Sequence, residues 1–387
     1  MFKKNLLFVI LFILIFCVIS LFNYLTDPYN IFFNHNNFLY MSKHNKDMYE
    51  TILNLSKKIK FDYLVLGSST THGLIHKKLV ENKKAIYMIT TQFDVITQVE
   101  YLDFILDIHP EINTIIFPVE YAFYSINDTQ RTPSVNKRTI TAEDISRLLF
   151  SYETTSKSIK KVSEIIENFL SQGGHNIPPA DNGNIKEEIF GGTNEISVFT
   201  KRNYSDCLTK SFQKNKYDSI EKLKQIIQTK NKNIIFIFPP YHALTQAYLY
   251  KINKNDETEN IKRYIVKNFP NSKIIDMAFI NKYTEEPLED TNNYRDIVHP
   301  VGEPGYLFYC ALKYPEAFKN RDIFIQLTPD NIETTLKWQK ARLEKYIKLN
   351  DNYINTFINY PSEYRDTNIR KIFSMPETCE YYINKDL

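Results

Sequence analysis

The longest apolar block of the chain is its N-terminal segment. From Leu6 to Phe22 the sequence is almost uninterrupted in its apolar character, and Ser20 is its only polar residue. A run of about 17 residues is at the short end of the length that spans the hydrocarbon core of a bilayer. It ends in FNYLTDP and not in the small residues of a signal-peptide cleavage site. The block therefore predicts an uncleaved anchor over residues 1–25, with a buried core helix as the alternative.

The charges that flank this block predict its orientation. Lys3 and Lys4 precede it, whereas the other flank has Asp27 and no lysine or arginine before Lys43. Positive charge favours the cytoplasmic side of a membrane. We therefore expect a single-pass protein of a bacterial cytoplasmic membrane, with its N-terminus inside and the rest of the chain extracytoplasmic.

Short apolar runs alternate with helical patterns through the middle of the chain. Runs of this kind, rich in β-forming residues, are typical of buried strands, and their spacing is that of βαβ units. They read YLVLG (63–67), AIYMIT (85–90), NTIIFPVEY (113–121), NKNIIFIFPPYH (231–242) and NSKIIDMAF (271–279). The pattern predicts an α/β domain over residues 61–330, with a parallel sheet and helices on both of its faces.

The remaining segments are expected to surround this domain. Residues 26–60 read as a connecting region with a polar helix, and residues from about 125 to 215 as a helical and loop insertion that covers one sheet edge. Residues 331–387 are expected to form a C-terminal helical extension that packs on the domain, with contact to lipid head groups or a membrane partner as the alternative.

Composition excludes several classes of function. The 48 basic and 45 acidic residues give a net charge of +3 and no clustered basic face, so nucleic-acid binding has no support. None of the four cysteines lies in a CxxC pair or at ligand spacing from a histidine, so we expect no metal and no cofactor. The sequence does not assign a disulfide among Cys17, Cys207, Cys310 and Cys379.

Polar residues follow several of the predicted strands directly. In open α/β sheets, ligands bind beyond the carboxyl ends of the strands. Ser69 follows YLVLG and is either a nucleophile or a helix N-cap. His242 either lines a pocket or belongs to an ordinary loop, and Glu120 and Tyr121 either reach a pocket or pack at the sheet edge.

The late segment NYRDIVHP supplies the partners that a nucleophilic serine needs. Serine chemistry requires a base to take the hydroxyl proton and a group to orient that base. Asp296 and His299 are three residues apart, so the carboxylate can meet one imidazole nitrogen while the other faces Ser69. The alternatives are Ser68 as nucleophile, His72 as base, and Asp296 and His299 as ordinary surface residues.

The GSS block after a strand, together with the late D-x-x-H-P, resembles the SGNH (GDSL-type) hydrolase superfamily. It is similar in particular to the membrane-anchored branch that acylates cell-surface polymers, which includes the DltD and alginate-acetylation types. The resemblance covers most of residues 60–345 and implies a flavodoxin-like sheet, with Ser69 as nucleophile, His299 as base and Asp296 as its orienting carboxylate. It also implies a multi-spanning membrane O-acyltransferase as partner.

The chain departs from this family where the oxyanion hole is expected. The second block reads YMITTQFD and lacks the usual glycine, and the third reads PVEYAF with Glu120 in place of the G-x-N-D pattern. The hydroxyl of Thr91 and the backbone N–H of Ser69 are the candidate donors. The sequence predicts a serine O-acyltransferase or esterase that acts on a cell-envelope glycopolymer. The alternative is a non-catalytic glycan-binding or assembly module.

Overall fold

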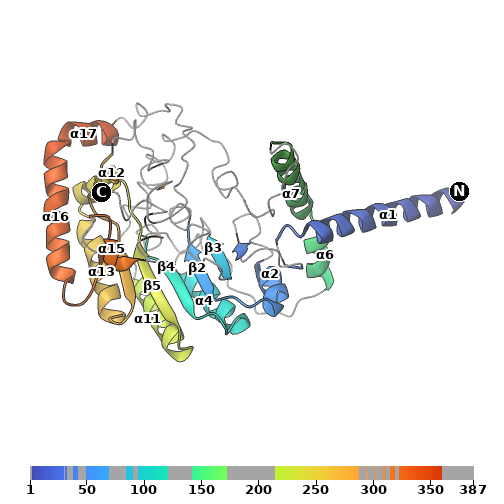
Figure 1. The fold of residues 1–387 in the computed structure, drawn as a ribbon, viewed down its shortest axis with the longest axis horizontal. Coiled ribbons are helices and arrows are strands. Elements are labelled where there is room, and N and C mark those ends of the chain that lie inside the picture. The colour runs from blue at the N-terminus through green and yellow to red at the C-terminus, as the bar shows by residue number, and fades with distance from the viewer. Residues whose placement is uncertain are drawn as a thin grey trace.

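The computed structural model gives an α/β domain from which one long apolar helix projects (Figure 1). It describes residues 2–29, 31–32, 38–41, 49–68, 84–89, 95–120, 142–171, 214–286, 294, 300, 307, 310, 314–318 and 322–359. The prediction of an α/β chain with an N-terminal apolar helix is confirmed.

The described strands form one 7-stranded sheet in the order β1-β3-β2-β4-β5-β6-β7. Neighbouring strands from β1 to β6 pair in parallel, and the short β7 pairs antiparallel with β6. In this register Leu64 lies opposite both Ile86 on β3 and Ile115 on β4. The strands are β1 (Phe38–Met41), β2 (Tyr63–Gly67), β3 (Ala85–Ile89), β4 (Thr114–Pro118), β5 (Asn233–Phe238), β6 (Lys273–Asp276) and β7 (Ile325–Gln326).

The order of the strands defines where a ligand site is expected. Numbered along the chain from β2 to β6, the order β3-β2-β4-β5-β6 is 2-1-3-4-5, which is the order of one common class of doubly wound sheets. The chain leaves β2 on one side to form β3 and returns on the other side to form β4. The topological switch point of the sheet therefore lies beyond the carboxyl ends of β2 and β4.

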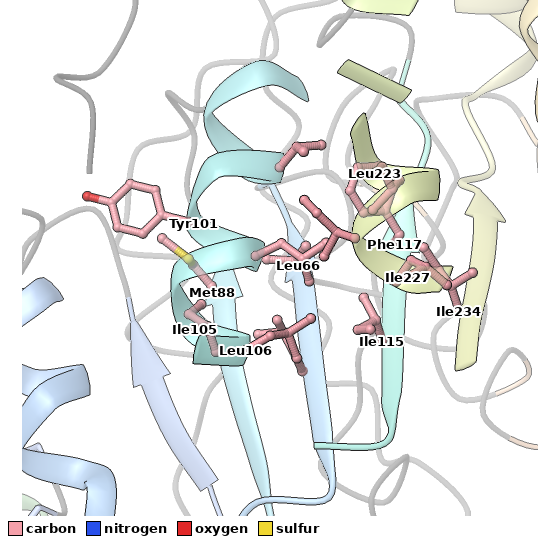
Figure 2. Close-up of a cluster of buried hydrophobic side chains, with 14 of the residues drawn as sticks. Leu66, Met88, Tyr101, Ile105, Leu106, Ile115, Phe117, Leu223, Ile227 and Ile234 are labelled. Carbon is pink, nitrogen blue, oxygen red and sulfur yellow. The ribbon is translucent and has the colours of Figure 1, made fainter. Parts of the chain in front are cut away.

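Both faces of the sheet are buried, because successive strand residues point to opposite sides. On one face Leu66 and Phe117 lie in the same apolar cluster as Leu223 (Figure 2). Helices α2 (Tyr49–Leu55), α4 (Val95–Ile108), α11 (Lys214–Thr229) and α13 (Asn255–Asn268) contribute to this cluster. On the other face Val65 packs in a second cluster that contains Phe318 of α15 (Pro315–Phe318).

The C-terminal part of the described chain is helical, as the sequence predicts. Helices α16 (Ile332–Leu349) and α17 (Asp351–Asn359) pack with α12 (Ala243–Lys251) around Leu244, Leu343 and Ile354. A buried ion pair joins α13 to the sheet, because Lys262 Nζ lies 2.6 Å from Asp276 Oδ2. Helix α16 is attached to this pair, because Gln339 Nε2 donates to the same oxygen at 2.8 Å.

Helix α1 (Phe2–Thr26) extends away from the domain (Figure 1). Its segment Phe8–Thr26 is long and apolar enough to cross a membrane and is almost entirely exposed, and it is the one such helix among the described residues. The base of α1 contacts α6 (Ala142–Phe150) and α7 (Tyr152–Ser171).

Two regions differ from their predicted form. The connecting region supplies the edge strand β1, and the described part of its polar helix comprises α2 and a 3₁₀ turn at Ser56–Lys58. The described part of the expected insertion, α6 and α7, packs against α1. An amphipathic pattern predicts that a helix packs against a partner but does not identify that partner. The sequence therefore could not show that α6 and α7 pack against α1.

Candidate functional site

Four neighbouring strands end in polar side chains at the carboxyl edge of the sheet. Along β2, β4, β5 and β6 these are Ser68, Glu120, His242 and Asp276. Of the residues that the sequence singles out, Ser68, Glu120 and His242 are therefore described. The predicted site residues Ser69, His72, Thr91, Tyr121, Asp296 and His299 lie outside the described residues.

A short buried hydrogen bond lies at the topological switch point. The hydroxyl of Ser68 donates to Glu120 Oε2 at 2.6 Å, and the two residues are 4% and 1% exposed. The chain that carries Glu120 is fixed beside β5, because the N–H of Val119 donates to the carbonyl of Ile237 at 2.7 Å. A hydrogen bond from a hydroxyl to a carboxylate is about twice as strong as one between neutral groups. This pair therefore ties the end of β2 to the end of β4.

His242 holds together several segments behind this edge. The residue is fully buried and serves as the N-cap of α12, where its Nδ1 accepts from the N–H of Leu244 at 3.1 Å. Its Nε2 lies 2.6 Å from the carbonyl of Glu286, which the neutral ring with its proton on Nε2 satisfies as donor. Both ring nitrogens of His242 thus bond to backbone groups of the protein, at Leu244 and Glu286. In the described geometry His242 therefore fixes these two backbone segments and does not contact a substrate.

Tyr294, from the late segment NYRDIVHP, packs against the chain that follows β5. Its hydroxyl donates to the carbonyl of Pro240 at 3.1 Å, and its ring packs edge-on against His242 with centroids 5.1 Å apart. Burial raises the pKa of the Tyr294 phenol well above its usual value, so the donor stays protonated. Tyr294 also forms an isolated antiparallel bridge with Pro300. Tyr294 and Pro300, which flank Asp296 and His299 in the sequence, are therefore paired with each other, and Tyr294 is fixed to the chain that follows β5.

A Ser-His-Glu arrangement occurs elsewhere in the described chain. His109 Nε2 lies 3.0 Å from the hydroxyl of Ser56, and its Nδ1 lies 3.1 Å from Glu111 Oε1. The same carboxylate oxygen accepts from the N–H of Phe61 at 3.1 Å. These residues precede β2 and β4 in the chain, so they lie at the amino edge of the sheet, opposite the switch point.

This second arrangement is structural. Ser56 and His109 are fully buried, and the hydroxyl of Ser56 also donates to the carbonyl of Leu53 at 2.8 Å. Burial lowers the pKa of His109, while Glu111 partly offsets that effect. A fully buried serine offers no route for a substrate. The sequence alone does not distinguish His109, because a lone histidine at the end of a helix carries no distinguishing pattern.

The described residues contain no group of three or more histidine, cysteine, aspartate or glutamate side chains that could hold a metal ion. No protein-family model and no curated protein matches this chain. The candidate site therefore depends on the geometry of the carboxyl edge and on the resemblance in the sequence.

Proposed function

We propose that this chain is a membrane-anchored, extracytoplasmic serine O-acyltransferase or esterase of the SGNH type that acts on a cell-envelope glycopolymer. Ser69 is the nucleophile, His299 its base and Asp296 the carboxylate that orients the base. A multi-spanning membrane O-acyltransferase would supply the acyl group if the reaction is a transfer.

The observation that carries the proposal is that described residues next to the two distant sequence blocks, Ser68 and Tyr294, lie beyond the carboxyl ends of β2 and β5 in one sheet. The GSS block follows β2, and the Tyr294–Pro300 bridge that flanks the D-x-x-H segment is attached behind β5. Between these strands lies only β4 in the sheet order. The 2-1-3-4-5 strand order supports the flavodoxin-like fold that the resemblance implies.

Ser68 and Glu120 favour Ser69 over Ser68 as the nucleophile. Ser68 is buried, and its hydroxyl hydrogen already lies in a 2.6 Å bond to Glu120. In the family that the sequence resembles, the residue before the nucleophile is often acidic. Here a serine takes that place, and Glu120 brings a carboxylate to it from β4.

The proposed reaction proceeds in two steps that share one base. Ser69 Oγ attacks the carbonyl carbon of the acyl donor while His299 takes the hydroxyl proton, and the leaving group departs with that proton. A sugar hydroxyl, or water, then attacks the acyl-serine ester and gives its proton to His299, which passes that proton to Ser69 Oγ as the bond between Oγ and the acyl carbon breaks. The N–H of Ser69 and the hydroxyl of Thr91 are the proposed oxyanion donors.

A disulfide supports the extracytoplasmic compartment. Cys310 is disulfide-bonded and fully buried, whereas Cys17 in α1 is free. The two other cysteines of the sequence lie outside the described residues. Disulfides persist in oxidising compartments and are rare in the cytosol. This agrees with an anchor whose N-terminal lysines stay inside.

The test uses the full chain in detergent with a fluorophosphonate probe and p-nitrophenyl acetate. We expect labelling and turnover in the wild type, loss of both in Ser69→Ala, and strongly reduced labelling in His299→Ala. Ser68→Ala is the matched control and should still be labelled. Labelling that persists in Ser69→Ala would refute the assignment. A folded wild type without labelling, which binds glycopolymer, would favour the non-catalytic module.

A further inference from the structure

The exposed apolar residues outside α1 gather beside its base. Helices α6 and α7 lie across that base in Figure 1 and contact it. Outside α1, most of the exposed large hydrophobic residues of the described chain belong to these two helices. They are Ile145, Phe150, Tyr152, Ile159 and Ile166.

The exposed side of α7 carries no charge among the described side chains. Tyr152, Ile159 and Ile166 follow at intervals of seven residues and are 88%, 55% and 52% exposed. Ser156 and Ser163 are the other exposed residues on the same side. We call these five residues the uncharged stripe. The charged residues at 153, 157, 160 and 161 are less exposed, whereas a helix that faces water normally exposes its charged side.

The corner between α6 and α7 reaches along the apolar length of α1. The rings of Phe150 and Phe16 have centroids 4.9 Å apart. Phe16 lies six residues before Phe22 (22 minus 16), where the apolar run ends, which is about 9 Å along a helix axis. If α1 spans the membrane, Phe150 therefore lies within the hydrocarbon depth, since that core is about 30 Å thick.

Several polar groups at this corner find partners within the protein, although the buried Asn23 Oδ1 has no hydrogen bond among the described residues. Asn23 Nδ2 donates to the carbonyl of Leu149 at 2.7 Å and to Thr155 Oγ1 at 2.9 Å. Ser151 accepts from the N–H of Thr154 at 3.0 Å and so caps α7. Internal pairing of this kind is what a low-dielectric environment requires.

Side chains of α7 also fix its position against the end of α1. Lys161 Nζ donates to the carbonyl of Asp27 at 2.9 Å, and Lys157 lies over the ring of Tyr29 at 4.8 Å. Thr26 donates to Ser158 at 2.7 Å. The orientation of the uncharged stripe therefore follows the orientation of α1.

We propose that the corner at Phe150–Tyr152 and the uncharged stripe insert into the lipid interface of the leaflet from which α1 emerges. The occupant of this surface is lipid, because the surface is continuous with the exposed apolar length of α1. Amphipathic helices that lie in the interface bury an apolar face at the boundary of head groups and acyl chains. The pair of helices α6 and α7 would then set the height and tilt of the sheet's carboxyl edge above the membrane. The inference rests on the membrane anchoring that is part of the proposed function.

The test uses the full chain in phosphatidylcholine vesicles with and without brominated acyl chains, which quench tryptophan on contact. The sequence has 1 tryptophan. This residue, Trp338, lies on α16 on the far side of the domain from α1 (Figure 1), so the wild type is the internal control. The first stripe reporter is Tyr152→Trp with Trp338→Phe. The anchor reporter is Phe12→Trp with Trp338→Phe. Ile159→Trp with Trp338→Phe is a second stripe reporter.

We expect brominated lipid to quench most of the emission of both stripe reporters and of the anchor reporter, and to leave wild-type emission unchanged. Quenching of the anchor reporter with unquenched stripe reporters would overturn the inference while leaving the anchor intact. Stripe emission that is blue-shifted but unquenched would indicate a protein partner, such as a second copy, and would also overturn it. An unquenched anchor reporter would refute the anchoring itself.

Discussion

The buried ion pair between Lys262 of α13 and Asp276 of β6 links α13 to the sheet, and Gln339 of α16 is hydrogen-bonded to both partners. The Asp276 side chain is fully buried and that of Lys262 is 3% exposed. Substituting Lys262→Met keeps an unbranched side chain but removes the ammonium 2.6 Å from the carboxylate. Asp276 then keeps only the N–H groups of Gln339 at 2.8 Å and Ala278 at 2.9 Å among the partners described here.

Removing one partner of a buried ion pair typically costs about 3–5 kcal/mol, because a charge remains buried without compensation. We therefore expect Lys262→Met to lower the free energy of unfolding by about that amount, which is a large share of the roughly 5–15 kcal/mol of a typical domain. The double substitution Lys262→Met with Asp276→Asn should recover about 1–3 kcal/mol of this loss, because no charge stays buried.

Urea unfolding of the full chain in detergent, followed by the emission of Trp338, measures these differences. Trp338 lies next to Gln339 on α16 and so reports the helix that the pair holds. The matched control is Lys340→Met, because the Lys340 side chain is 44% exposed and its Nζ lies 3.9 Å from Asp256 Oδ1. The control should change stability by less than about 0.5 kcal/mol. If Lys262→Met is as mild as Lys340→Met, the reasoning from burial is wrong.

Four further predictions follow from other contacts. Glu120→Gln should lower the free energy of unfolding by about 1 kcal/mol, because an amide oxygen accepts a weaker hydrogen bond than a carboxylate; unchanged urea unfolding would contradict this. Burial lowers the native pKa of His109, so the unfolded chain binds more protons and stability should fall as the pH decreases through about 6.5. Thermal unfolding between pH 7.5 and 5.5 tests this, and His109→Gln should flatten the profile. Reduction, or Cys310→Ser, should cost about 2–4 kcal/mol in thermal or urea unfolding, and an unchanged transition would argue against a structural disulfide. His242→Ala should cost about 2–3 kcal/mol through the lost helix cap and the lost bond to a loop carbonyl, and should reduce probe labelling together with stability. A folded His242→Ala with full labelling would show that the loops keep their places without it.

The core of the fold could be predicted from the sequence because its strands carry strong local signals. The runs around Leu64, Ile115 and Phe236 are apolar on both faces, which is typical of parallel strands covered by helices on each side. The exposed apolar run of α1 is similarly unambiguous in length and composition. Patterns of this kind depend on local composition, which a single sequence contains.

Other features could not be predicted, because they depend on contacts between distant segments. Strand β1 has only 4 residues and lies in a polar region of the sequence. Its place in the sheet depends on its pairing with β3. The bond between Ser68 and Glu120 joins residues 52 positions apart, and that between Asn23 and Thr155 joins residues 132 apart. Neither residue type nor spacing indicates such a pairing before the strand order and helix packing are known.

The described polar side chains at the carboxyl edge of the sheet hold the fold together, and this fits the proposed chemistry. Asp276 is hydrogen-bonded to α16, and His242 caps α12 and contacts Glu286 and Tyr294, so both residues position the edge and are not available to a substrate. Ser68 is likewise committed to Glu120. Of the two serines after Gly67, only Ser69 is then left for the nucleophile's role in our proposal. A strand that ends in two hydroxyls thus uses the first to fix its own end, which is a condition for presenting the second accurately.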